Sequence, residues 1–107
     1  MITYDDFAKL DIRIGTVMSA ERIEGADKLL KLIVDLGEER RQIVAGIATI
    51  VADPAELVGK QLPILMNLEP RMLRGVESQG MMLAADENDL PVLLYPEHPI
   101  PNGSKIR

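Results

Sequence analysis

The alternation of apolar residues in steps of two constrains the fold more than any other feature of this sequence. Between residues 29 and 36, leucine or valine fills every even position, and Lys31 and Asp35 lie between them, which is the period of a half-buried strand. A helix is the alternative, because positions 29, 32, 33 and 36 also fit a helical stripe. Gly37–Arg40 has the composition of a tight turn, and the following Ile- and Val-rich segment would be a partner strand. This context favours a β-hairpin.

Most of the remaining chain is predicted as short strands separated by turns. The predicted strands are Leu10–Ala20, Leu29–Leu36, Arg41–Ala48, Gln61–Leu68, Gly80–Ala85 and Val92–Tyr95, with a terminal strand at Lys105–Arg107. The predicted loops and turns are Glu24–Lys28, Glu69–Gln79, Asp86–Asp89 and Asn102–Gly103. Gly15 interrupts the first strand and predicts a bulge or a tight bend there.

One short helix is predicted between the third and fourth strands. Asp53 can cap its first turn, Pro54 suits its first position, and Gly59 can end it. Three strands, a short helix and further strands is the order of an OB-fold, an all-β, five-stranded Greek-key barrel. Other small barrels are compatible with this order. The length of 107 residues predicts a single domain over residues 1–107.

Composition limits the chemistry and the compartment. The chain has no cysteine, so disulfides, thiolate metal sites and cysteine nucleophiles are excluded, in keeping with a reducing cytoplasm. The acidic N-terminus does not resemble a signal peptide, and no apolar run has the length of a membrane span. We therefore expect a cytoplasmic protein with no membrane partner.

Candidate catalytic groups are few and isolated. His98 is the only histidine and lies in a proline-rich tail, and the serines have no histidine near them in the sequence. Asp86–Asp89 is rich in oxygen ligands but lacks the alternating spacing of a calcium loop. There is no glycine-rich phosphate loop. We predict no catalytic residue, no metal site and no cofactor.

The segment Asn67–Met82 is the strongest candidate for binding. It carries Arg71 and Arg74, with glycines that allow close approach to its backbone. Guanidinium groups and neutral donors suit contacts to phosphate and sugar. The neutral donors and acceptors of the segment are Asn67, Ser78 and Gln79. The alternative interpretation of the residues alone is a polar surface loop with two solvated arginines.

A second basic cluster is formed in sequence by Lys28, Lys31, Arg40 and Arg41, and the barrel could place it beside Asn67–Met82. The net charge of −5 opposes nucleic-acid binding, although a local basic patch can lie on an acidic protein. Tyr4, Phe7 and Tyr95 are the only aromatics, and none falls in the central strands. Recognition of RNA through its backbone is therefore favoured over base stacking.

Five segments resemble one known family. Phe7–Gly15, Asp27–Leu29, Val34–Gly37, Arg41–Ile47 and, above all, Asn67–Met81 are similar to the tRNA-binding domain at the C-terminus of many methionyl-tRNA synthetases. The same domain occurs in free-standing structure-specific tRNA-binding proteins. The resemblance covers nearly the whole chain. It implies an OB-fold that binds folded tRNA without catalysis, and a homodimer in the free-standing forms.

The resemblance also implies roles for individual residues. The chain would be an accessory or β subunit of a methionyl-tRNA synthetase, or a trans-acting tRNA-binding factor, with the catalytic subunit as a partner. The expected RNA contacts that the family pattern implies are Lys28, Lys31, Arg41, Asn67, Arg74, Ser78, Gln79 and Met81, and residue chemistry alone adds Arg71. Glu69 and Met72 stand where basic residues are common in the family, so weak binding is expected.

A related branch resembles secretion chaperones that bind unfolded protein. Its characteristic start and tail are similar to Asp6–Arg13 and Pro101–Ile106. The methionines of this chain would suit varied apolar partners. A chaperone-like homodimer that binds peptides is therefore the alternative function. The apolar segment Leu90–Tyr95 and the proline-rich tail are the candidate dimer interface.

Overall fold

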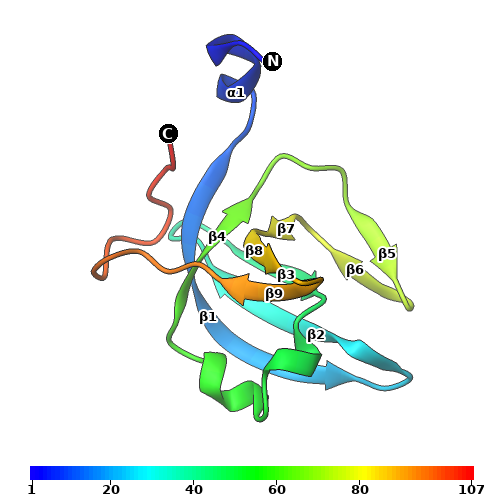
Figure 1. Ribbon diagram of the computed structural model, residues 1–107. Helices are drawn as coiled ribbons and strands as arrows, with labels where there is room; N and C mark the ends of the chain where they lie inside the picture. The colour runs from blue at the N-terminus through cyan, green and yellow to red at the C-terminus, as the bar shows by residue number, and fades with distance from the viewer.

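Strand β1, Ile12–Ile23, organises the fold because it pairs with two different strands along its length. In the computed structural model, which describes residues 1–107, its first half pairs antiparallel with β4 (Gln61–Leu65). Its second half pairs antiparallel with β2 (Ala26–Asp35), and Thr16 is shared by both pairings. Figure 1 shows β1 as one long curved ribbon. A shift of register between Val17 and Ser19 lies just after the change of partner.

The main sheet has five strands in the order β3-β2-β1-β4-β7, and two separate hairpins accompany it (Figure 1). The elements not yet given are α1 (Tyr4–Ala8), β3 (Arg40–Ala45), η1 (Ala48–Ile50), η2 (Pro54–Leu57), β5 (Arg71–Leu73), β6 (Val76–Ser78), β7 (Met81–Met82), β8 (Ala84–Glu87) and β9 (Leu90–Leu93). The predicted all-β, OB-type architecture is confirmed, with short helices between β3 and β4. No ladder joins β3 to β7, so the barrel is not closed by strand pairing.

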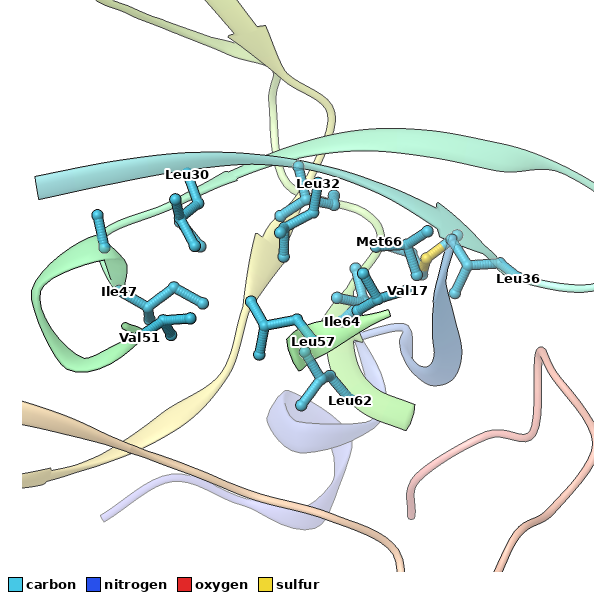
Figure 2. Packing of buried hydrophobic residues seen from close by; sticks show 14 residues of the cluster. Val17, Leu30, Leu32, Leu36, Ile47, Val51, Leu57, Leu62, Ile64 and Met66 are labelled. Atoms are coloured by element: carbon cyan, nitrogen blue, oxygen red, sulfur yellow. The ribbon is translucent and has the colours of Figure 1, made fainter. Parts of the chain in front are cut away.

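The core confirms that residues 29–36 form a strand. Leu30, Leu32 and Val34 are fully buried and Leu36 is 3% exposed, as the alternation predicted. They belong to a cluster of 14 buried residues, and Figure 2 shows Leu30 facing Ile47 across it. Burying each such side chain contributes about 1.5–3 kcal/mol, so this cluster fixes the sheet on which the surface features are placed.

The bulge that was one of the two predictions for Gly15 is not present. It pairs regularly with Leu62, and the register shift lies later in β1. A Cβ at Gly15 would lie 2.5 Å from Val34 Cγ1 and 2.8 Å from Leu36 Cδ2. The glycine is therefore required by the close packing of β1 against side chains of β2, and a sequence pattern cannot distinguish this from a bulge.

The predicted helix start is confirmed and its type is corrected. Asp53 Oδ1 accepts a hydrogen bond from the Ala55 amide at 3.0 Å, and Pro54 begins η2. The segment is a 3-10 helix, preceded by a second one, η1. The N-terminal α1, which was not predicted, begins with a capping box between Thr3 and Asp6. These helices have three to five residues, too few for any of them to cross a membrane.

Two predicted loops were wrong. The predicted loop Glu69–Gln79 contains the β5–β6 hairpin. The predicted loop Glu24–Lys28 is shorter than expected, because β2 already begins at Ala26. The predicted terminal strand is reduced to an isolated bridge between Lys105 and Arg13. Strands of three residues are too short to show an alternation of apolar and polar residues, so the sequence pattern did not predict β5 and β6.

Candidate nucleic-acid interface

The β5–β6 hairpin carries the residues of the strongest sequence motif. Arg71 pairs with Ser78 and Leu73 with Val76, and the two strands are joined by Arg74 and Gly75. Both turn residues have positive φ, +52° at Arg74 and +80° at Gly75. Such a two-residue turn suits the right-handed twist of a hairpin. The turn therefore presents Arg74 at the outermost point of the hairpin.

The tip of the β5–β6 hairpin meets the turn between β1 and β2. Lys28 and Arg74 line one open hollow of about 400 Å³ with residues 25–27 and Leu29. In Figure 1 the two hairpin ends lie on the same side of the molecule. In OB-folds the loops at these two places, with the face of strands 2 and 3, bind oligonucleotides. The fold thus brings together two predicted contacts that lie 46 residues apart in sequence.

Lys28 and Arg74, the tip cluster, are free of ion pairs. No carboxylate lies within 4.0 Å of either charged group, and the same is true of Arg71 and Arg40. Asp27 lines the same hollow and reduces its positive potential. Exposed cations without partners can bind phosphate without first breaking an internal contact. A local basic site is therefore present on a chain of net charge −5.

Lys31 is placed near this site but is already paired. Its Nζ lies 2.6 Å from Glu21 Oε1 on the neighbouring strand β1. Residues 31 and 21 are direct partners in the β1–β2 ladder, so the pair crosses the outer face of the sheet. Met81, another predicted contact, is 40% exposed on β7. Lys31 can therefore add charge to the site only in competition with Glu21.

Arg41 and Asn67 hold backbone instead of facing solvent freely. Arg41 Nη1 donates to the carbonyl of Met66 at 2.6 Å, and its Nε and Nη2 donate to Glu39 Oε1. Asn67 Nδ2 donates to the carbonyl of Lys9 at 2.6 Å, and its Oδ1 accepts from the amide of Asp11 at 2.8 Å. Both contacts fix residues 66–67, directly after β4 and before the β5–β6 hairpin begins.

Ser78 and Gln79 attach the β5–β6 hairpin to β3. The buried hydroxyl of Ser78 accepts from the Val44 amide at 2.9 Å and donates to the Gly80 carbonyl at 2.8 Å. Gln79 Oε1 accepts from the Gln42 amide at 3.0 Å. Gly80 has φ +138° and a Cβ there would lie 2.7 Å from the Leu65 carbonyl oxygen, so only glycine fits beside this attachment.

One residue of this attachment was missed by sequence reasoning. Gln42 Nε2 donates to the Glu77 carbonyl at 2.8 Å, from the middle of β3 to the middle of β6. Gln42 lies between Arg41 and the apolar residues 43–45 of β3, and nothing in the sequence names its distant partner. Of the predicted site residues, Lys28 and Arg74 come together, Arg71 and Met81 are exposed nearby in the chain, and four others bind the protein's own backbone.

The resolved pKa shifts lie away from this surface. A hydrogen bond from Arg13 at 2.9 Å lowers the pKa of Asp11, and Asp11 in turn raises the pKa of Arg13. Hydrogen bonds from Thr3 lower the pKa of Asp6 at the start of α1. These groups stabilise the N-terminal end of the chain. No group of three or more His, Asp or Glu side chains is arranged to hold a metal ion.

Residues 12–105 match the model of a family described as a putative tRNA binding domain. The chain belongs to this family. Similar segments occur in the methionine–tRNA ligases of Methanothrix thermoacetophila, 57% identical over 107 residues, and Thermotoga maritima, 51% identical over 105 residues. They cover 100% and 98% of this chain, which spans 16% of the length of either enzyme. The resemblance found in the motifs is confirmed: this is a tRNA-binding domain homologous to part of those ligases.

Solved structures of the same fold include two kinds of protein. A MetRS related protein from Pyrococcus horikoshii has a TM-score of 0.93 and 40% identity, covering 100% of this chain and 98% of that one. The chaperone CsaA from Bacillus anthracis has a TM-score of 0.90 and 36% identity, covering 100% and 99%. The same fold therefore occurs in a protein described as related to MetRS and in one described as a chaperone.

Proposed function

We propose that this tRNA-binding domain binds the backbone of folded tRNA through the tip cluster and acts without catalysis. The observation that carries the proposal is the meeting of Lys28 and Arg74, both without carboxylate partners, at the two loops that OB-folds use for ligands. Arg71 and Met81 are the further direct contacts. Arg41, Asn67, Ser78 and Gln79 hold the surface in shape, because their polar atoms bind backbone groups.

The position of the aromatic residues supports contact with backbone instead of stacked bases. Tyr4 and Phe7 line a hollow with the end of the tail, residues 105–107. Tyr95 lies in a different hollow, where Lys60 Nζ is 5.0 Å from the centre of the Tyr95 ring. None lines the hollow of the tip cluster. Phosphate contacts predict affinity that falls steeply with salt.

Titration of folded tRNA at several salt concentrations tests this proposal. Arg74→Asn should weaken binding by about 1–2 kcal/mol, the strength of one charge-assisted contact, and reduce the salt slope. Lys60→Ala is the matched control, because it removes one positive charge in the hollow beside Tyr95. Binding that ignores salt, or an equal loss in both variants, would contradict a site at the tip cluster.

We propose further that the domain serves a methionyl-tRNA synthetase as an accessory or β subunit, or as a trans-acting factor, in the cytoplasm. The similarity to segments of methionine–tRNA ligases supports this role. Added in trans to a ligase catalytic region, the chain should lower the KM for tRNA and leave kcat unchanged, because it adds binding and no chemistry. The chain alone should show no aminoacylation.

A homodimer is the proposed assembly, and an apolar surface supports it. An open hollow of about 390 Å³ is lined mostly by apolar side chains, among them Ile14, Leu94 and Ile106. Tyr95, which also lines this hollow, is about half exposed, as are Leu90 and Val92 of β9. Burying these side chains would stabilise an interface. Sedimentation should show a dimer at micromolar concentration, and Leu94→Asp should shift it to monomer.

The same hollow favours a second candidate function, the binding of unfolded protein. Its lining is apolar, and the chaperone CsaA shares the fold. Under this alternative the chain would suppress aggregation of a denatured client protein diluted from guanidinium. Leu94→Asp should abolish that effect and Arg74→Asn should not. The opposite ranking of the two variants in a tRNA titration separates the functions.

A further inference from the structure

The β5–β6 hairpin is joined to β3 almost entirely through side chains. No ladder connects β3 with β6 or β7. One main-chain hydrogen bond, from the Gln79 amide to the Gln42 carbonyl at 2.8 Å, joins the two segments. The remaining hydrogen bonds between them involve the side chains of Gln42, Ser78 and Gln79, with Arg41 donating to the Gln79 carbonyl at 3.2 Å. The position of the hairpin therefore depends on individual side chains.

Gln42 has a special place among these side chains. Its side-chain Nε2 donates to the Glu77 carbonyl at 2.8 Å. Its main-chain amide donates to Gln79 Oε1, and its main-chain carbonyl accepts from the Gln79 amide. Glu77 is the central residue of β6 and pairs with Met72 of β5. Gln79 and Ser78 hold the base of the hairpin, so the Gln42 side chain is the contact nearest to the Arg74 turn on this seam.

We propose that Gln42 is a positioning residue for tRNA binding. Its hydrogen bond to Glu77 keeps the hairpin against β3, so that Arg74 stays beside Lys28 in the tip cluster. This inference rests on the proposed binding of tRNA at that cluster. Gln42 is half-buried, whereas the Ser78 hydroxyl is buried. Loss of the Gln42 side-chain amide should therefore loosen the outer part of the hairpin, while Ser78 and Gln79 still hold its base and the core stays closed.

The direct test replaces the amide and keeps the length of the side chain. Gln42→Met removes the bond to Glu77 and leaves the main-chain bonds to Gln79 in place. Gln61→Met is the matched control, because the Gln61 amide also bridges two segments: it donates to the Ile100 carbonyl at 2.7 Å and accepts from the Ile100 amide at 3.0 Å. Both variants lose an amide that binds backbone, and only one lies on the seam.

Three measurements are compared: tRNA affinity at fixed salt, amide hydrogen exchange of residues 71–78, and thermal unfolding. Gln42→Met should weaken tRNA binding by about 2–12-fold, the equivalent of one net hydrogen bond, and speed exchange in the hairpin. Both variants should lower the unfolding temperature, Gln61→Met at least as much because its amide makes more hydrogen bonds, and Gln61→Met should leave tRNA affinity unchanged. Gln42→Asn, too short to reach Glu77, should behave like Gln42→Met and serves if that variant does not fold.

The double variant Gln42→Met with Arg74→Asn decides whether Gln42 acts through Arg74. If it does, the combined loss of affinity is smaller than the sum of the two single losses. Full additivity, or equal losses in Gln42→Met and Gln61→Met, overturns the positioning role. Unchanged affinity in Gln42→Met beside a weakened Arg74→Asn also overturns it and leaves the tRNA site standing. A wild-type chain that does not bind tRNA refutes the proposed function itself.

Discussion

The β5–β6 and β8–β9 hairpins have the same turn geometry and opposite chemistry. Each turn has two residues with positive φ: Arg74 at +52° and Gly75 at +80°, and Asn88 at +52° and Asp89 at +65°. Asn and Asp accept this left-handed conformation readily, whereas a long side chain such as arginine costs about 1–2 kcal/mol there. One turn follows local preference and carries negative charge. The other places a cation against local preference, which fits the proposed binding role of Arg74.

The two hairpins also differ in how they are attached. The β5–β6 hairpin is held by the buried hydroxyl of Ser78 and the amide of Gln42. The β8–β9 hairpin packs on the core through Leu93, and its outer face leaves Leu90 and Val92 about half exposed. Specific polar contacts fix a position more narrowly than apolar contact does. The comparison therefore fits the two proposed roles, a positioned hairpin for tRNA and an apolar hairpin for a second copy.

The largest predicted effect concerns the attachment of the β5–β6 hairpin. Ser78→Ala leaves the buried Val44 amide without its acceptor, and this should lower the free energy of unfolding by about 1–3 kcal/mol. Ser104→Ala is the control, because the Ser104 hydroxyl bonds the Pro101 carbonyl at an exposed position. Urea unfolding of both variants checks the difference. Equal losses of stability in the two variants would show that the buried Ser78 hydroxyl stabilises the fold no more than the exposed Ser104 hydroxyl does.

The next effect separates binding from conformational strain at Arg74. Arg74→Gly should raise the free energy of unfolding by about 1 kcal/mol, because glycine accepts positive φ, while tRNA binding falls. Asn88→Gly in the β8–β9 turn should change stability by only a few tenths of a kcal/mol, since asparagine already tolerates this conformation. Thermal unfolding and tRNA titration are measured on both. A destabilised Arg74→Gly would contradict the strain.

A smaller effect tests the negative charge of the β8–β9 turn. Asp89→Asn keeps a residue that tolerates positive φ and removes one charge from a chain of net charge −5. Affinity for tRNA should rise by less than about twofold in low salt and be unchanged in high salt, because exposed charges are screened. Stability should not change. An increase that persists in high salt would indicate direct contact with RNA.

The smallest effect concerns pH and the N-terminal carboxylates, in contrast to the exposed ones of the β8–β9 turn. The pKa of Asp11 is lowered in the folded chain by Arg13. Because the pKa is lowered on folding, the pair stabilises the fold at pH values above the ordinary pKa of a carboxyl group. This stabilisation is lost as the pH falls through the pKa that Asp11 has in the folded chain. The stability difference between wild type and Asp11→Asn should therefore be constant near pH 7 and shrink below about pH 4. A difference that grows in acid would contradict the pair.

Sequence patterns predicted the parts of the fold that repeat. The alternation in β2, the cap at Asp53 and the order of strands around the short helices were confirmed. The β5–β6 hairpin was missed because its strands have three residues each and its turn is Arg-Gly instead of Asn-Gly. Local propensity fails at Arg74 because the conformation is fixed by the hairpin and not by the residue.

The candidate site was found in sequence as a set of residue types, and its geometry was not. Lys28 and Arg74 meet only because two loops from distant segments end at the same place. Which polar residues face solvent and which bind backbone depends on partners far along the chain: Asn67 binds a carbonyl 58 residues away, and Gln42 binds one 35 residues away. One sequence contains no information about such pairs.

The main sheet is complete without residues 71–77, since its five strands pair with one another and β6 adds no rung to it. Insertions, deletions or a grafted sequence between Pro70 and Ser78 would leave every ladder of that sheet in place. The length and charge of the β5–β6 hairpin can therefore be changed without changing the strand pairing of the sheet that carries it. The β5–β6 hairpin is therefore a place where a different recognition sequence can be installed by design.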